Sequence, residues 1–122
     1  MKFNEDRPIF EQIALLLEDR ILSGELAEKS RLPSARELAV SLEVNPNTAG
    51  RALQLLADAG CAYVERGAGY YVASGAIERL RALRRERFFT KEVPRFLDQM
   101  RTLGIKIDDL LPYWNIGNQV NE

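Results

Sequence analysis

Two helix-start signals that follow each other closely in the chain constrain its fold more than any other feature. The first is a capping box over residues 34–37, in which the Ser34 side chain can accept from the Glu37 N–H and the Glu37 side chain can accept from the Ser34 N–H. In the second, Asn45 suits the N-cap and Pro46 suits the first helical position. Between the end of the first of these helices and Asn45, the two residues Glu43 and Val44 leave room only for a tight turn. The pattern therefore predicts a short helix, a turn and a second helix whose N-terminus is presented to solvent.

Apolar side chains at helical spacing extend this pair of helices. A helix before the pair begins at Pro8 and ends at Gly24, and its apolar face consists of Ile9, Ile13, Leu16, Leu17 and Ile21. The second helix of the pair ends at Gly60 and turns three residues inward, namely Ala49, Leu53 and Leu56. After Gly60, two β-like runs over 62–65 and 70–73 are joined by a Gly-containing loop, which predicts a hairpin. A hairpin this small must pack on the helices.

Residues after 75 return to helical spacing, interleaved with arginines. Thr90 is the expected N-cap of a helix that begins late, because Pro94 is tolerated only in a first turn. Asp108 is the expected cap of a last short helix, which Pro112 and a frayed polar tail over 115–122 would end. The predicted fold is mainly α with a small β-hairpin, and its predicted boundary separates residues 1–74 from a helical segment over 75–122.

Composition excludes several classes of protein. A single cysteine, Cys61, excludes an internal disulfide, and the absence of histidine removes His-dependent catalysis and His-ligated metal. No apolar run approaches the ~18 residues of a membrane span, and the N-terminus lacks the apolar region of a signal peptide. We therefore expect a cytoplasmic protein that is not an enzyme, with no catalytic residues, no metal, no cofactor and no membrane association.

The net charge of −1 conceals an uneven distribution. Residues 1–28 carry a net charge of −4 and residues 102–122 carry −2, whereas residues 76–101 carry +4. A basic middle between acidic ends is compatible with binding to a polyanion, because local patches set the field at a surface. The alternative is that charge merely fluctuates along solvated helices.

Three helices followed by a hairpin are the elements of a winged helix-turn-helix. A DNA major groove admits one α-helix, whose N-terminal residues reach the base edges. With the apolar face inward, four polar side chains point outward: Asn47, Arg51, Gln54 and Asp58. Asn and Gln can pair with adenine, and Arg can pair with guanine or contact phosphate. Gly50, beside them, costs about 1 kcal/mol relative to Ala in a helix interior. Either DNA approaches the backbone closely there, or Gly50 is an incidental surface glycine.

At this point the chain resembles the GntR family of bacterial transcription regulators over roughly residues 7–73. Four segments carry the resemblance: Pro8–Ile13, Leu32–Ala39, Val44–Thr48 and Arg66–Val72. The short helical tail is similar to that of the YtrA-like subfamily, in which the C-terminal helices serve dimerisation. The chain departs from the family in two places: residues 27–30 replace the usual Pro-Gly-containing link, and Gly50 stands where many relatives carry a larger residue.

The resemblance implies a set of DNA contacts. Arg36 would contact the DNA backbone or a base near the groove, and Ser34 would cap its helix and touch phosphate. The wing tip, with Arg66 and Gly67, would enter the minor groove. With three residues at the start of the recognition helix and the outward Arg51, the predicted DNA-binding residues are Ser34, Arg36, Asn45, Asn47, Thr48, Arg51, Arg66 and Gly67.

The composition of the C-terminal segment predicts that it binds a second copy of the chain. Its apolar side chains outnumber what two or three short helices can bury: Ile77, Leu80, Leu83, Phe88, Phe89, Val93, Phe96, Leu97, Met100, Leu103, Ile105 and Ile107. Burial against a second copy predicts a homodimer. We therefore expect a homodimeric regulator from a bacterium that binds a palindromic site in double-stranded DNA and represses by excluding polymerase. An unknown small-molecule effector would bind at the dimer interface. The alternative is a winged-helix module that binds a protein and not DNA.

Overall fold

Both helix-start signals form as predicted in the computed structural model, which describes residues 3–120 and the side chains of residues 3–117. Helix α2 (Ala35–Leu42) begins after Ser34, whose side chain accepts from the Glu37 N–H at 3.0 Å, while the Glu37 carboxylate accepts from the Ser34 N–H at 3.2 Å. Helix α3 (Pro46–Asp58) begins after Asn45, whose side-chain oxygen accepts from the Asn47 N–H at 2.8 Å. These caps fix where both helices begin.

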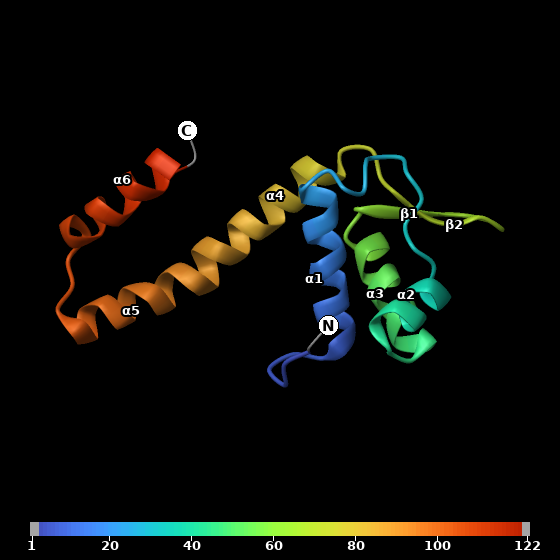
Figure 1. Ribbon diagram of the computed structural model, residues 1–122, viewed down its shortest axis with the longest axis horizontal. Helices are drawn as coiled ribbons and strands as arrows, with labels where there is room; N and C mark the ends of the chain where they lie inside the picture. The colour runs from blue at the N-terminus through green and yellow to red at the C-terminus, as the bar shows by residue number, and fades with distance from the viewer. Residues whose placement is uncertain (1–2, 121–122) are drawn as a thin grey trace. The chain divides into compact units, whose positions relative to one another are not determined.

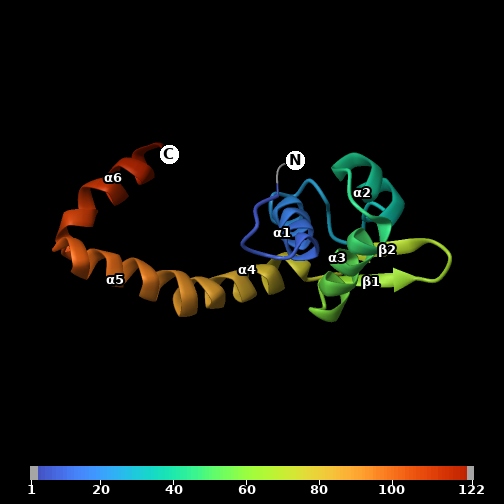
Figure 2. The same cartoon turned by 90° about the horizontal axis from the view of Figure 1, so that it is seen from below.

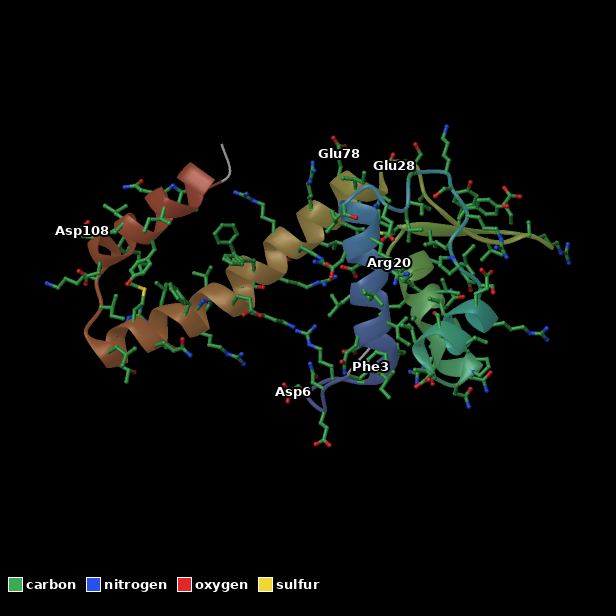
Figure 3. All side chains as sticks on the ribbon, in the orientation of Figure 1. Phe3, Asp6, Arg20, Glu28, Glu78 and Asp108 are labelled. Atoms are coloured by element: carbon green, nitrogen blue, oxygen red, sulfur yellow. The ribbon has the colours of Figure 1, made fainter. Side chains whose placement is uncertain are left out.

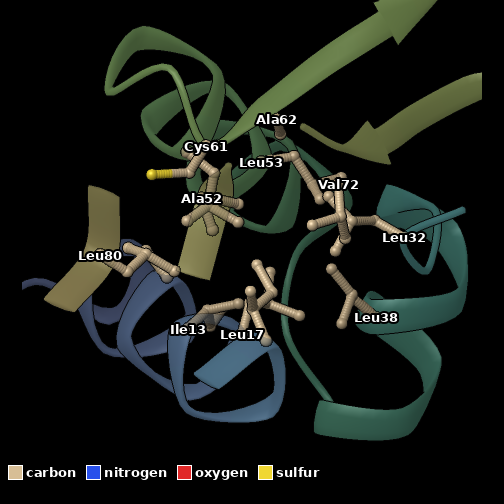
Figure 4. Packing of buried hydrophobic residues seen from close by; sticks show 14 of the residues in the cluster. Ile13, Leu17, Leu32, Leu38, Ala52, Leu53, Cys61, Ala62, Val72 and Leu80 are labelled. Carbon is tan, nitrogen blue, oxygen red and sulfur yellow. The ribbon is translucent and has the colours of Figure 1, made fainter. Parts of the chain in front are cut away.

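The first of two compact units runs through Leu83 and contains a hydrophobic core. Helix α1 (Ile9–Leu22) and α2 both pack against α3, and the hairpin of β1 (Ala62–Glu65) and β2 (Gly69–Val72) follows α3. Figure 4 shows that the buried core draws side chains from every one of these elements, including Ile13, Leu17, Leu38, Leu53 and Val72. In Figures 1 and 2 the turn of the hairpin lies at the end of this unit away from α1.

The predicted boundary near residue 74 coincides with the end of the hairpin, but packing extends the first unit into the next helix. Helix α4 (Ala76–Arg87) buries Ala76 and Leu80 completely in the same core. The division between the compact units therefore falls inside α4, between Leu83 and Arg84. The functional boundary at residue 74 stays a prediction.

The link over residues 27–30 has a structural role. Lys29 and Leu32 donate their N–H groups to the carbonyls of Val72 (2.7 Å) and Tyr70 (2.8 Å), and the Val72 N–H donates to the Ser30 carbonyl (2.9 Å). Residues 29–32 therefore run along the edge of β2 that β1 leaves open. The neighbouring Glu28, which Figure 3 labels near the start of α4, accepts with its carboxylate from the N–H groups of Gly75 (2.9 Å) and Ile77 (3.2 Å).

The second unit, from Arg84 onward, corrects the sequence prediction at Thr90. The chain stays helical from α4 through a π-helical turn, η1 (Phe88–Glu92), into α5 (Val93–Leu103). Thr90 does not cap a helix, because its hydroxyl donates to the Glu86 carbonyl at 2.8 Å inside this continuous helical path. Pro94 falls in the first turn of α5 directly after η1, where the regular bonding is already interrupted and its missing N–H costs little.

The end of the chain is also more helical than predicted. A 3₁₀ turn, η2 (Ile107–Leu110), leads into α6 (Leu111–Val120), and Figure 1 shows the chain reversing direction between α5 and α6. Asp109, and not Asp108, accepts from the Lys106 N–H at 2.9 Å. Pro112 lies in the first turn of α6, where a helix tolerates proline, so it does not end the helix. Of the predicted frayed tail, residues 121–122 lie outside the described residues.

Candidate nucleic-acid interface

The outer face of α3 begins with exposed polar side chains. Asn47 and Arg51 are exposed and Thr48 is half-buried, whereas Ala49 and Leu53 on the opposite face are fully buried. The N-terminal turn of a helix leaves N–H groups without helical partners and carries partial positive charge, which favours phosphate. The first two turns of α3 thus combine amide, hydroxyl and guanidinium donors, the groups that bind base edges and phosphates.

Arg51 is held by an aromatic ring. Its guanidinium carbon lies 3.9 Å from the centroid of the Phe10 ring, at the start of α1. A guanidinium over a ring face at this distance is a cation–π contact. The contact restricts where the Arg51 side chain can point, and it still leaves the residue exposed.

The N-terminus of α2 supplies a second group of predicted residues. Arg36 is exposed in its first turn, and Ser34 is committed to the cap described above. The Ser34 N–H, followed by the Ser34 hydroxyl and the Arg31 guanidinium, holds the pKa of the Glu37 carboxyl below its usual value. Glu37 is therefore an anion at neutral pH and completes the capping box.

The turn of the hairpin holds Arg66 and Gly67, both exposed. Gly67 has φ of +82°, and a Cβ there would meet nothing within 4 Å. The backbone conformation, and not crowding inside the protein, therefore requires glycine at this position. The Ala68 N–H closes the turn by donating to the Glu65 carbonyl at 2.9 Å.

Two polar contacts that sequence analysis did not predict join the hairpin to the helices. The Tyr70 hydroxyl donates to the Gln54 side-chain oxygen at 3.0 Å, and the Gln54 amide donates to Asp58 at 2.8 Å. Gln54 is exposed as predicted, but both ends of its amide are bonded within the protein. Arg31 donates from Nε to the Ala68 carbonyl at 3.0 Å and from Nη1 to Glu37 at 3.2 Å. The only sequence signal for Arg31 was its position just before the capping box.

Gly50 faces the neighbouring helix. A Cβ at Gly50 would lie 3.9 Å from the Ala35 Cβ of α2, an ordinary van der Waals contact, and Gly50 is half-buried. A methyl group therefore fits between α2 and α3. Packing within the protein does not require glycine here.

Among residues 3–120, no group of three or more His, Cys, Asp or Glu side chains is arranged to hold a metal ion. Over the same residues, no helix has both the length and the apolar character needed to cross a bilayer.

Comparisons with known proteins relate both units of the chain to regulatory proteins. The sequence model of the bacterial regulatory proteins, gntR family, matches residues 9–72. The HTH-type transcriptional regulator YhcF of Bacillus subtilis (strain 168) is 34% identical over 112 residues, which are 90% of this chain and 89% of YhcF. The HTH-type transcriptional repressor YtrA of the same organism is 38% identical over 69 residues, which are 57% of this chain and 53% of YtrA.

Solved structures are similar over almost the whole chain. The crystal structure of a transcriptional regulator of the GntR family from Bacteroides thetaiotaomicron superposes with a TM-score of 0.77 at 38% sequence identity. The superposition covers 93% of this chain and 99% of that chain. The similarity to this structure and to YhcF therefore extends beyond the hairpin into the second unit.

Proposed function

Because the chain belongs to the gntR family of bacterial regulatory proteins, DNA-binding transcription regulators and not enzymes, we propose that it is a homodimeric repressor that binds a palindromic operator. The exposed start of α3 carries this proposal. Its cap at Asn45, its exposed Asn47 and Arg51, and its buried opposite face suit insertion into a major groove. The repressor role is supported by the relative YtrA, which is named as a transcriptional repressor.

We propose that the DNA interface combines α3 with the two structures beside it. Arg36 at the start of α2 and Arg66 at the hairpin tip are both exposed, and each can contact phosphate or a groove. The proposed contacting residues are Ser34, Arg36, Asn45, Asn47, Thr48, Arg51, Arg66 and Gly67. Within this set Asn45 and Ser34 act mainly as helix caps, because their side-chain oxygens already accept backbone N–H groups.

The second unit supports the proposed dimer. Its large apolar side chains are mostly exposed in the single chain: Phe88, Phe89, Phe96, Leu103, Ile105, Ile107, Leu111, Tyr113, Trp114 and Ile116. A second copy would bury this surface and place two α3 helices about 34–36 Å apart, or a multiple of that spacing, on one DNA duplex. A small-molecule effector would bind at this dimer interface, and repression would follow from exclusion of polymerase.

Selection of bound sequences from a random duplex pool tests the function. A palindromic consensus is expected, and Arg36→Ala and Arg66→Ala should each weaken binding to it by about tenfold or more. Arg20→Ala is the matched control, because Arg20 pairs with Glu25 at the end of α1, outside the proposed interface. Unchanged affinity in both test variants would refute the proposed interface.

A salt series separates DNA binding from the alternative of a protein-binding winged helix. Affinity for the selected duplex should fall steeply between about 50 and 200 mM salt, because binding releases the counterions of phosphates. A chain that selects no duplex at low salt would favour the protein-binding alternative.

A further inference from the structure

The hairpin turn is joined to α2 through one side chain. The Arg31 Nε donates to the Ala68 carbonyl in the turn at 3.0 Å, and its Nη1 donates to Glu37 Oε1 at 3.2 Å. The same Glu37 oxygen accepts from the Ser34 N–H at 3.2 Å. A continuous polar path therefore runs from the hairpin turn to the first residue of the α2 cap.

The backbone around Arg31 is arranged for this path. Arg31 lies in the segment that pairs with the open edge of β2 and forms an isolated bridge with Tyr71. Gly69 lies beside the guanidinium, since a Cβ there would be 3.6 Å from Nε. The hairpin is only four paired residues long, and a two-stranded pair of this kind is marginally stable alone. Its tip therefore depends on contacts with the rest of the unit.

We propose that Arg31 is a positioning residue for DNA binding, which holds the hairpin turn against the N-terminus of α2 and thereby sets where Arg66 and Gly67 meet the DNA. This inference rests on the proposed function. Arginine suits the role because its planar guanidinium bonds two acceptors in a fixed relative geometry, which a lysine ammonium does not reproduce. Arg31→Lys keeps the charge and loses that geometry, so it separates positioning from charge.

The first test uses the free protein. Amide hydrogen exchange over residues 63–72 should be faster in Arg31→Lys and Arg31→Ala than in the wild type, with exchange in α1 and α3 unchanged. Arg20→Ala, which breaks an ion pair elsewhere in the same unit, should leave exchange over 63–72 as in the wild type. Unchanged exchange over 63–72 in both Arg31 variants would overturn the inference without any reference to DNA.

The second test measures affinity for the selected duplex. Arg31→Lys should lose about tenfold while the dependence on salt keeps its slope, because no phosphate contact is removed. When Arg66→Ala is already present, adding Arg31→Lys should lower the affinity little further, because both substitutions act through the hairpin tip. The inference would be overturned if Arg31→Lys binds the duplex with wild-type affinity. It would also be overturned if the losses in binding free energy of the two substitutions add in the double variant. A wild-type chain that binds no duplex would instead refute the proposed function.

Discussion

At the scale of single residues, two side chains occupy left-handed backbone that normally favours glycine. Lys29 has φ of +70° and Glu43 has φ of +56°. The conformation of Lys29 is fixed by a tertiary hydrogen bond, because its N–H donates to the Val72 carbonyl. The conformation of Glu43 is fixed by the end of a helix, because Glu43 is the C-cap of α2. A side chain in this region costs free energy that glycine does not pay. Neither position could be recognised from the sequence, where both residues are ordinary.

Lys29→Gly is therefore expected to stabilise the protein. Removing the left-handed strain should stabilise the folded state by more than the greater entropy of glycine stabilises the unfolded chain. The free energy of unfolding, measured by urea denaturation, should therefore rise by about 0.5–1 kcal/mol. Lys29→Ala is the matched control, because it removes the same charge and retains the Cβ. Equal stability of the two variants would contradict the explanation by backbone strain.

Gly50→Ala tests the two explanations that the sequence left open. The methyl group fits against Ala35, so helix propensity alone should raise the free energy of unfolding by about 1 kcal/mol. If DNA approaches the backbone of α3 closely, the same variant should bind the selected duplex more weakly although it is more stable. If Gly50→Ala raises the free energy of unfolding and leaves the affinity for the duplex unchanged, Gly50 is incidental to DNA binding. A loss of stability would contradict the packing seen between α2 and α3.

At the scale of elements, the sequence predicted what local signals encode. The capping box at Ser34, the Asn45 cap and the inward face of α3 all formed as expected, because each depends on residues within one or two helical turns. The predicted apolar face of α1 formed only in part: Ile13, Leu17 and Ile21 are fully buried, whereas Ile9 is 42% exposed and Leu16 is half-buried. What the sequence missed are contacts between residues far apart in sequence. Arg31 and Ala68 are 37 residues apart, and Glu28 and Gly75 are 47 apart. The predicted DNA contacts remain predictions, because they depend on a partner.

Glu28 illustrates such a contact at the start of α4. The N–H groups of Gly75 and then Ile77 hold the pKa of the Glu28 carboxyl below its usual value, with Lys29 adding to the effect. A carboxylate whose pKa is lowered by folding stabilises the folded state above its unfolded-state pKa. That contribution is lost as the pH falls through the lowered folded-state pKa. The link that departs from the family pattern thus supplies a cap for the next helix.

Glu28→Gln should therefore be less stable than the wild type at neutral pH. The difference in free energy of unfolding should shrink on acidification, because protonation removes the same charge from the wild type. Urea denaturation at a series of pH values measures this convergence. Glu25→Gln removes an equal charge from a residue that caps no helix and serves as the control. A difference that is absent at neutral pH, or that grows with acid, would contradict the cap.

At the scale of the whole molecule, the two units differ in how they bury apolar surface. The first unit has a core of buried side chains from all its elements, whereas the second buries Met100 and leaves most of its large apolar residues exposed. Exposed apolar surface of this extent is uncommon in a monomer and marks an interaction site. The proposed dimer thus follows from the part of the chain in which the apolar residues exceed what one copy can bury.

Leu103→Glu tests this explanation. Leu103 is 71% exposed near the end of α5, so the change should leave each protomer folded while it places a charge in the proposed interface. The mass in solution should fall from that of a dimer to that of a monomer, as measured by sedimentation. Affinity for a palindromic duplex should fall with it, because a monomer contacts only one half-site.

Val40→Glu makes the same kind of change at a residue 81% exposed on α2 and should remain dimeric. A Leu103→Glu chain that stays dimeric would place the interface elsewhere, and a monomeric variant with wild-type affinity would contradict the pairing of two half-sites.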